Sequence, residues 1–222
     1  RANRVLAVIA SMYSWAGKQQ LVPRGMNPAG EIERYPEEGR ERFLSSEELE
    51  RLGSALRIAE TDGVEWQPNA TKATSKHAPK SAEARRVKLD ASAAAAIRLL
   101  IFTGARLREI LHLKWAHVDI ERGLLFLPDS KTGKKTIVLN APALAVLQGL
   151  KRSGDYVIAG KSADAPRSDL KRPWAMVSAL AGLEGLRIHD LRHSFASIGA
   201  GSGMGLPIIG RLLGHANART TA

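Results

Sequence analysis

The sequence predicts an α+β fold, a mostly helical domain with a small three-stranded antiparallel sheet. Apolar side chains recur at helical spacing through much of the chain, for example over residues 46–59 and 91–102. The spacing changes to that of strands over residues 124–128 and 135–140. These two segments flank the turn sequence DSKTGK and predict a β-hairpin. A short extended segment at residues 117–120 is the expected third strand.

The N-terminal residues predict one helix and then a linker. Residues 3–20 carry apolar side chains at the spacing of an amphipathic helix, from Val5 to Trp15. Such an apolar stripe needs a partner surface. Residues 21–42 contain Pro and Gly repeatedly and show no period, which is typical of a linker.

Helix signals alternate with one long polar segment in the centre of the chain. Ser45-Ser46-Glu47-Glu48 predicts a serine cap followed by acidic residues in the first helical turn. Residues 61–88 are polar and basic and predict a long, mobile loop or insertion. Asp90 is expected to cap an apolar helix that ends at Thr103-Gly104, and a second helix is expected over residues 105–115.

Helices are also expected after the hairpin. Three prolines each stand where a first helical turn tolerates them: Pro142, Pro173 and Pro207. The sequence RIHDLRHSFASIGA indicates a further helix.

The composition favours a polyanion as partner. The 222 residues include 33 Lys and Arg against 22 Asp and Glu, a net charge of +11. Nucleic acid is the commonest ligand of so basic a protein, although a merely soluble basic surface has the same composition. The absence of cysteine excludes disulfides, thiolate catalysis and cysteine-ligated zinc. The sequence has no long apolar run and no export leader, so we expect a piece of a longer cytoplasmic protein.

Basic residues stand where helices or strands begin or end: Arg106, Lys131, His189, Arg192 and His215. Arg106 follows the Thr103-Gly104 break, and Glu109 lies on the same helical face, where it can support the guanidinium group. Lys131 lies in the hairpin turn, from which a long side chain can reach a partner's groove. Each also has a structural explanation, a surface ion pair for Arg106 and solubility for Lys131.

The histidines divide into candidates and structural residues. His189 and Arg192 share a face at the start of a helix, where free N–H groups suit a phosphate. A capping histidine beside a solvated arginine explains this pair equally well. His215 ends the apolar run LPIIGRLLG, a position typical of a C-terminal cap. The other histidines are interpreted as structural, with His193 facing elsewhere: His77, His112, His117 and His193.

The candidate residues predict an anion site without a metal or other cofactor. No carboxylate cluster or pair of histidines at zinc spacing accompanies them. Two arginines, a lysine and two histidines brought together would stabilise a phosphate that gains negative charge in a transition state.

Four segments resemble the motifs of the tyrosine recombinases. TGARLREIL resembles their first arginine box, and DSKTGKKTIVL is similar to their β-hairpin lysine segment. HDLRHSFAS resembles their His-x-x-Arg box, and LLGHANARTT the segment before the nucleophile. The resemblance covers residues 43–222 as a catalytic domain. Residues 1–20 resemble the last helix of a core-binding domain, and residues 21–42 would join the two.

The resemblance implies DNA recombination or integration through a 3′-phosphotyrosine link, in a phage or mobile genetic element. Arg106 and Arg192 would bind the phosphate oxygens, and Lys131 would protonate the leaving oxygen. His189 would assist proton transfer at the tyrosine, and His215 would donate to the phosphate. The implied partners are double-stranded DNA, with no membrane, and further copies of the chain in a homotetramer on DNA.

The sequence departs from the family at the nucleophile. It ends at Ala222, seven residues after His215, and none of Tyr13, Tyr35 and Tyr156 follows that histidine. We therefore expect this fragment to be inactive and monomeric or weakly associated. Two alternatives remain: a DNA-binding regulator or degenerate recombinase without catalysis, and a nicking enzyme that resembles type IB topoisomerases.

Overall fold

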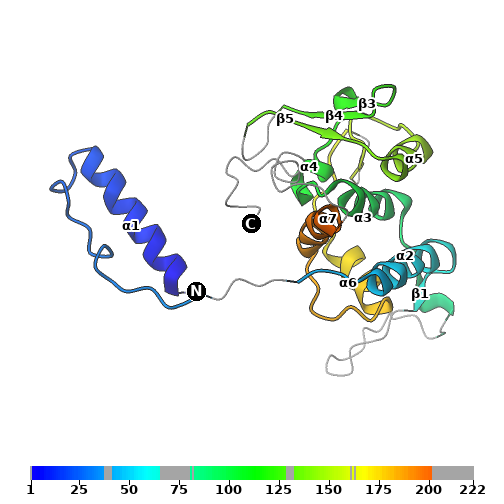
Figure 1. Cartoon of the computed structure of the whole chain (residues 1–222), viewed down its shortest axis with the longest axis horizontal. Coiled ribbons are helices and arrows are strands. Elements are labelled where there is room, and N and C mark those ends of the chain that lie inside the picture. Colours follow the sequence, from blue (N-terminus) through cyan, green and yellow to red (C-terminus); the bar gives the residue numbers. More distant parts are fainter. Residues whose placement is uncertain are drawn as a thin grey trace. The chain divides into compact units, whose positions relative to one another are not determined.

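The computed structural model describes residues 2–37, 42–65, 81, 83–128, 133–160, 162 and 164–201. The chain divides into two compact units, Arg1–Glu41 and Arg42–Ala222 (Figure 1). The finer division expected from the sequence, with boundaries at residues 20 and 42, stays a prediction.

The first unit contains the predicted N-terminal helix, α1 (Ala2–Lys18). Its apolar residues are largely exposed, among them Val8 at 63% and Trp15 at 57%. The chain then returns along α1 through turns. The Asn3 side chain holds this return, because it donates to the Tyr35 carbonyl oxygen at 2.8 Å and accepts from the Tyr35 N–H at 2.9 Å.

The second unit begins with α2 (Ser46–Thr61), which has the predicted serine cap. The Glu48 N–H donates to the Ser45 hydroxyl at 3.2 Å, and the Ser45 N–H donates to the Glu48 carboxylate at 3.0 Å. Arg42 also donates to Glu48, at 2.9 Å. The bond from Arg42 and the one from the Ser45 backbone lower the pKa of Glu48 to about 2. The helix start is thus fixed by two reciprocal bonds and an ion pair.

Helix α3 (Ala91–Thr103) is the centre of the second unit. Asp90 caps it as predicted, accepting from the Ala93 N–H at 2.8 Å. Four consecutive alanines, residues 93–96, are buried, and small side chains let neighbouring helices approach closely. Helices α2, α4, α5, α6 and α7 all contact α3.

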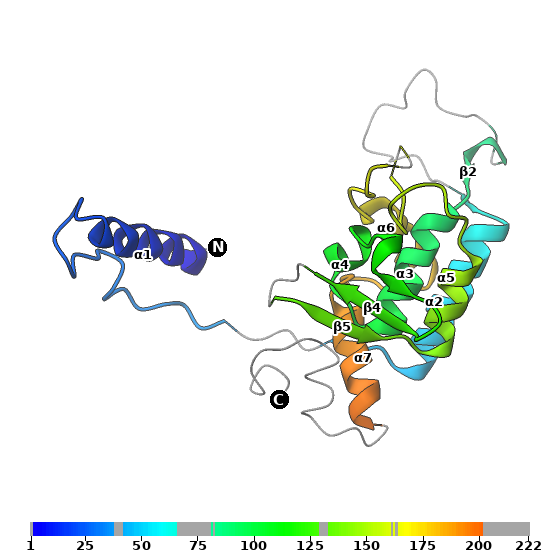
Figure 2. The same cartoon turned by 90° about the horizontal axis from the view of Figure 1, so that it is seen from above.

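The predicted sheet is present, with the order β3-β4-β5 (Figure 1), and Figure 2 shows β4 and β5 side by side. Its strands are β3 (Val118–Asp119), β4 (Leu124–Leu127) and β5 (Lys135–Val138). All pairs are antiparallel, and β4 and β5 form the expected hairpin, in which Leu125 pairs with Ile137 and Leu127 with Lys135. One face is buried against the helices, whereas Phe126 on the other face is 42% exposed.

The remaining helices follow the predicted order. They are α5 (Ala141–Gly149), α6 (Lys171–Leu180) and α7 (Asp190–Gly201). Asn140 caps α5, and Pro142 lies in its first turn as expected. Pro207 lies outside the described residues.

The helix expected over residues 105–115 is shorter than predicted. Helix α4 spans only Leu107–Leu111, and a 3₁₀ turn, η2, follows at Trp115–His117. The chain leaves the helix because the Trp115 N–H donates to the Asp155 carbonyl oxygen at 2.9 Å and Lys114 forms a β-bridge with Tyr156. These long-range bonds replace the helical ones.

The segment over residues 61–88, predicted as a long loop or insertion, contains short regular elements near both ends. Strand β1 (Val64–Glu65) pairs with β2 (Arg86–Val87), and a 3₁₀ turn, η1 (Glu83–Arg85), precedes β2. Two-residue strands are too short to show a period in the sequence. Residues 66–80 and 82, within the same segment, lie outside the described residues.

The serine cap gives a stability prediction. We expect Ser45→Ala to destabilise the protein by about 1 kcal/mol, because the Glu48 N–H loses its acceptor. The neighbouring exposed residue Ser46 begins the helix, and Ser46→Ala is the matched control, with little expected change. Thermal unfolding followed by circular dichroism measures both. Equal melting temperatures for the two variants would contradict the assigned cap.

Candidate anion-binding site

Arg106 lies at the junction of α3 and α4. Gly104 ends α3 in the left-handed conformation, with φ of 59°, and Arg106 is the N-cap residue of α4. The Glu109 carboxylate accepts from the Arg106 backbone N–H and from its guanidinium group, both at 2.8 Å. The Glu109 side chain is 6% exposed. One nearly buried carboxylate therefore fixes both the backbone and the side chain of Arg106.

Arg192 reaches the same junction from α7. Its Nη1 donates to the Gly104 carbonyl oxygen at 2.7 Å, and the residue is buried. Burial and the nearby Arg106 together lower the pKa of Arg192 to about 10, although Glu109 opposes the shift. The structure thus brings together two arginines that are far apart in the sequence.

The start of α7, which carries Arg192, depends on Asp190. This aspartate is fully buried, and its carboxylate accepts from the Arg187 backbone N–H at 2.8 Å and from the Arg187 guanidinium group at 3.1 Å. No feature of the sequence had marked Asp190 as a candidate residue. It positions the turn before α7, since it ties residue 187 to the first helical residue.

Lys135 is a member of the site that the sequence analysis missed. It begins β5, its side chain is 4% exposed, and its Nζ lies 3.4 Å from the Glu109 carboxylate. Burial lowers the pKa of Lys135 to about 8. Glu109 raises that pKa, whereas Arg192 and Arg106 lower it. We name Arg106, Glu109, Lys135 and Arg192 the charge cluster.

A sequence signal for Lys135 exists but is ambiguous. Strand alternation places Lys135 on the same face as Ile137 and Leu139, which are buried. However, Val138 between them is also apolar, although it is 60% exposed. The inward face of β5 therefore cannot be chosen from these residues alone.

His189 lies immediately before α7 and is exposed. Partial burial of its ring lowers the pKa of His189, and His193 and Arg192 contribute to this, so the imidazole is mostly neutral at pH 7. The expectation that His193 faces elsewhere is wrong, because its ring lies edge-on to that of His189, with centroids 5.3 Å apart. A neutral imidazole can accept a proton.

The two other candidate residues, Lys131 and His215, lie outside the described residues. The described part of the candidate set is therefore Arg106 with Glu109, Arg192 and His189.

The charge cluster suits an anion. Three cationic groups lie around the nearly buried Glu109 carboxylate. Burial and then the repulsion between the cations lower the pKa of both Lys135 and Arg192. A bound phosphate would offset that repulsion. Among the residues that the structure describes, no group of three or more histidines and acidic residues is arranged to hold a metal ion. No helix in the same residues is long and apolar enough to cross a membrane.

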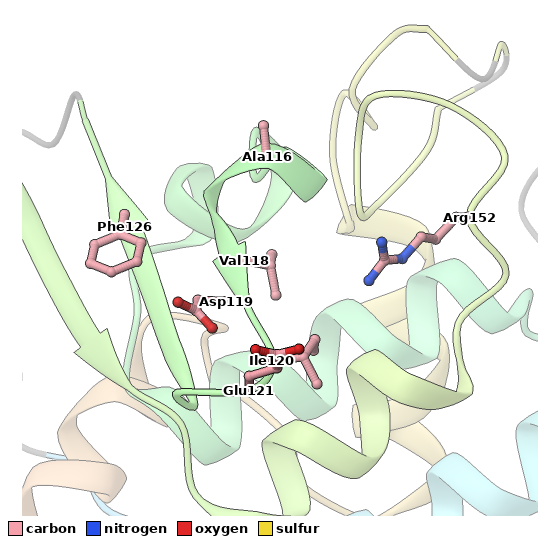
Figure 3. Close-up of a pocket in the computed structure, with 7 residues that line it drawn as sticks. All are labelled: Ala116, Val118, Asp119, Ile120, Glu121, Phe126 and Arg152. Carbon is pink, nitrogen blue, oxygen red and sulfur yellow. The ribbon is translucent and has the colours of Figure 1, made fainter.

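Figure 3 shows a hollow beside the sheet whose lining differs in charge from the charge cluster. Its lining residues are Ala116, Val118, Asp119, Ile120, Glu121, Phe126 and Arg152. Two carboxylates stand among them, and Arg152 is also engaged with the Trp115 ring, 4.6 Å from its centroid. Carboxylates repel a phosphate, so this hollow is a poor anion site.

Comparison with known proteins points to one family. The model of the phage integrase family matches residues 73–222. A tyrosine recombinase of Pyrococcus furiosus, XerA, is 31% identical over 133 residues, which are 56% of this chain and 46% of that protein. The chain spans about half the length of the curated relatives it matches.

Solved structures share the fold. The Tn1549 transposon integrase in complex with transposon right end DNA superposes with a TM-score of 0.68 at 14% identity, covering 99% of this chain and 72% of that one. The recombinase XerH bound to its difH substrate gives a TM-score of 0.62 at 20% identity, covering 95% and 57%.

The buried Lys135 gives a prediction for the pH dependence of stability. Its pKa is about 8 in the folded protein and 10.5 when unfolded. Between these values the unfolded state binds more protons, so the free energy of unfolding should rise with pH, by up to about 3 kcal/mol. Urea unfolding at pH 7.5 and pH 10 measures this rise. Lys135→Met should lack it, whereas Lys134→Met, at the exposed neighbouring lysine, should keep it. Identical pH dependence in the two variants would contradict the assigned burial.

Proposed function

Because the chain belongs to the phage integrase family, we propose that it is the catalytic domain of a tyrosine recombinase, which breaks and rejoins DNA through a transient 3′-phosphotyrosine link. The observation that carries this proposal is the charge cluster, in which Arg106 and Arg192 converge beside a single carboxylate. Two guanidinium groups are well suited to the non-bridging oxygens of a phosphodiester.

The net charge and the relatives support DNA as the substrate. A charge of +11 attracts a polyanion over long range. The similar Tn1549 integrase and XerH are both bound to DNA in their structures. A phosphodiester of duplex DNA is therefore the proposed ligand of the charge cluster.

The proposed chemistry is a transesterification. The tyrosine oxygen bonds to the phosphorus, and the bond to the 5′-oxygen breaks. His189, neutral at pH 7, would accept the tyrosine proton, and Lys131 would give a proton to the leaving 5′-oxygen. Arg106 and Arg192 would stabilise the charge on the pentacoordinate phosphorus. His215 would donate to a phosphate oxygen, and a 5′-hydroxyl of the partner strand would reverse the step.

The proposal extends to the assembly and the setting. Strand exchange between two duplexes needs a homotetramer on DNA, whereas the chain alone would be monomeric or weakly associated. We place the protein in the cytoplasm and propose that it belongs to a phage or other mobile genetic element. The proposed nucleophile is a tyrosine after His215, and Tyr13, Tyr35 and Tyr156 all precede that histidine.

The first prediction of this proposal concerns DNA binding. If about four to six phosphates are neutralised, the logarithm of the affinity for duplex DNA should fall with the logarithm of salt concentration with a slope near −4 to −5. Fluorescence anisotropy with a labelled duplex at several salt concentrations measures the slope. An affinity that does not depend on salt would argue against DNA as the ligand.

The second prediction concerns covalent chemistry. The 222-residue chain should not form a covalent adduct with a nicked suicide DNA substrate, whereas a chain extended through the expected tyrosine should do so. In the extended chain, Arg106→Ala or Arg192→Ala should reduce adduct formation roughly a hundredfold or more. Arg108→Ala, at an exposed arginine of α4, is the matched control and should have little effect. Adducts are counted on a denaturing gel.

Further measurements test the assigned roles and separate the alternatives. A 5′-phosphorothiolate substrate, whose sulfur leaves without protonation, should restore most of the adduct to Lys131→Ala but not to the arginine variants. DNA binding by the extended chain without any adduct would favour a regulator or degenerate recombinase. Relaxation of supercoiled DNA without paired sites would favour a topoisomerase-like enzyme. An adduct from the 222-residue chain itself would refute the assigned roles.

A further inference from the structure

Lys135 occupies a place where a lysine is costly. It faces the buried side of β5, opposite Leu127 and two residues before Ile137, both of which are buried. A charged group in such a place loses most of its hydration, and a specific partner must compensate. Lys134, its neighbour, faces solvent and has no such constraint. The burial of Lys135 therefore indicates that its ammonium group has a specific role at that position.

The contact between Lys135 and Glu109 indicates what this role is. Its ammonium group lies 3.4 Å from Glu109 Oε2, the same oxygen that accepts the Arg106 backbone N–H at 2.8 Å. The other oxygen, Oε1, accepts from the Arg106 guanidinium group. A carboxylate held on both oxygens has one orientation, and that orientation sets the position of Arg106. Lys135 thus contributes to the placement of Arg106 indirectly, through Glu109.

The same contact joins separate elements. Lys135 begins the second strand of the hairpin, Glu109 and Arg106 belong to α4 and its cap, and Arg192 approaches from α7. The ion pair therefore links the turn end of the hairpin to α4. Its charge also adds to the field of Arg106 and Arg192.

We propose that Lys135 is a positioning residue of the anion site: through Glu109 it fixes Arg106, and its positive charge strengthens phosphate binding without touching the phosphate. This inference rests on the proposed function, and it concerns a lysine distinct from Lys131 of the hairpin turn.

The role has a pH signature. Among the residues that the structure describes, Glu109 and Arg106 from α4 and Arg192 from α7 are charged groups that face Lys135. With a pKa of about 8, Lys135 carries its charge at pH 7 and loses it as the pH rises to 9.5. The arginines stay largely charged over this range, and His189 is already mostly neutral at pH 7. Anion affinity should therefore fall with a midpoint near pH 8.

Sulfate is a suitable probe, because it has the tetrahedral shape of a phosphate and keeps its charge between pH 7 and pH 9.5. Isothermal titration calorimetry of the 222-residue chain with sodium sulfate, at constant ionic strength, measures its Kd. We expect the Kd to rise roughly five- to tenfold between these pH values, the effect of one charge removed at several ångströms in a partly shielded site.

The variants separate position from charge. Lys135→Met should bind sulfate as weakly at pH 7 as the unchanged chain does at pH 9.5, with little further pH dependence. Lys134→Met removes the same charge from an exposed neighbour and should keep the original profile. Lys135→Arg keeps the charge and should bind tightly at both pH values, a rescue that a merely structural role would not produce. Circular dichroism checks that each variant is folded, and the titration of the unchanged chain needs no variant.

The outcomes distinguish this inference from the proposed function. Arg106→Ala should weaken sulfate binding at pH 7 more than Lys135→Met does. If Arg106→Ala binds as the unchanged chain does, the charge cluster is not the anion site and the proposed function loses its support. If Arg106→Ala weakens binding but Lys135→Met keeps the affinity and pH profile of Lys134→Met, the role of Lys135 is overturned and the proposed function stands.

Discussion

The hydrogen bond from the Arg192 guanidinium group to the Gly104 carbonyl oxygen holds the site together. Carbonyl groups at the end of a helix have no partner within it and carry the negative end of the helix dipole. Gly104 lies at that end of α3, where its left-handed backbone turns the chain toward Arg106. The bond therefore satisfies a buried carbonyl and also sets the separation of two arginines from distant parts of the sequence. Since α3 contacts every other long helix of its unit, a shift at this point would disturb the packing as a whole.

The buried cations of the charge cluster have a cost in folding stability. Burial lowers the pKa of Lys135 and Arg192, which means that the folded protein holds their protons less firmly than water would. Glu109 opposes both shifts and so reduces this cost. Sites of this kind trade folding stability for affinity. The packing of α3 against its neighbours, through its row of buried alanines, stabilises the fold and offsets that cost.

Local signals predicted most of the fold. Ser45 and Asp90 mark helix starts because a side-chain oxygen next to an apolar period has a direct structural effect. The hairpin followed from the change of period around its turn. Long-range bonds were not predictable: the pairing of Lys114 with Tyr156, which shortens α4, has no local trace. Within the site, Arg106 and Arg192 stood out through their motifs, whereas Lys135 became visible only when the strand's buried face was known. The roles of all these residues remain predictions.

The Ser194 hydroxyl gives the second unit an unusual mechanical connection. It accepts the Leu44 N–H at 3.0 Å and donates to the Asp190 carbonyl oxygen at 2.9 Å. Leu44 is the third residue of the unit, and Ser194 lies two residues after Arg192 on α7. A pull on the polypeptide that precedes the unit is therefore transmitted through Arg42 to α2 and through Leu44 to the helix that carries Arg192. Tension in the backbone before the unit therefore acts, through the Ser194 hydroxyl, on the helix that positions the Arg192 guanidinium group.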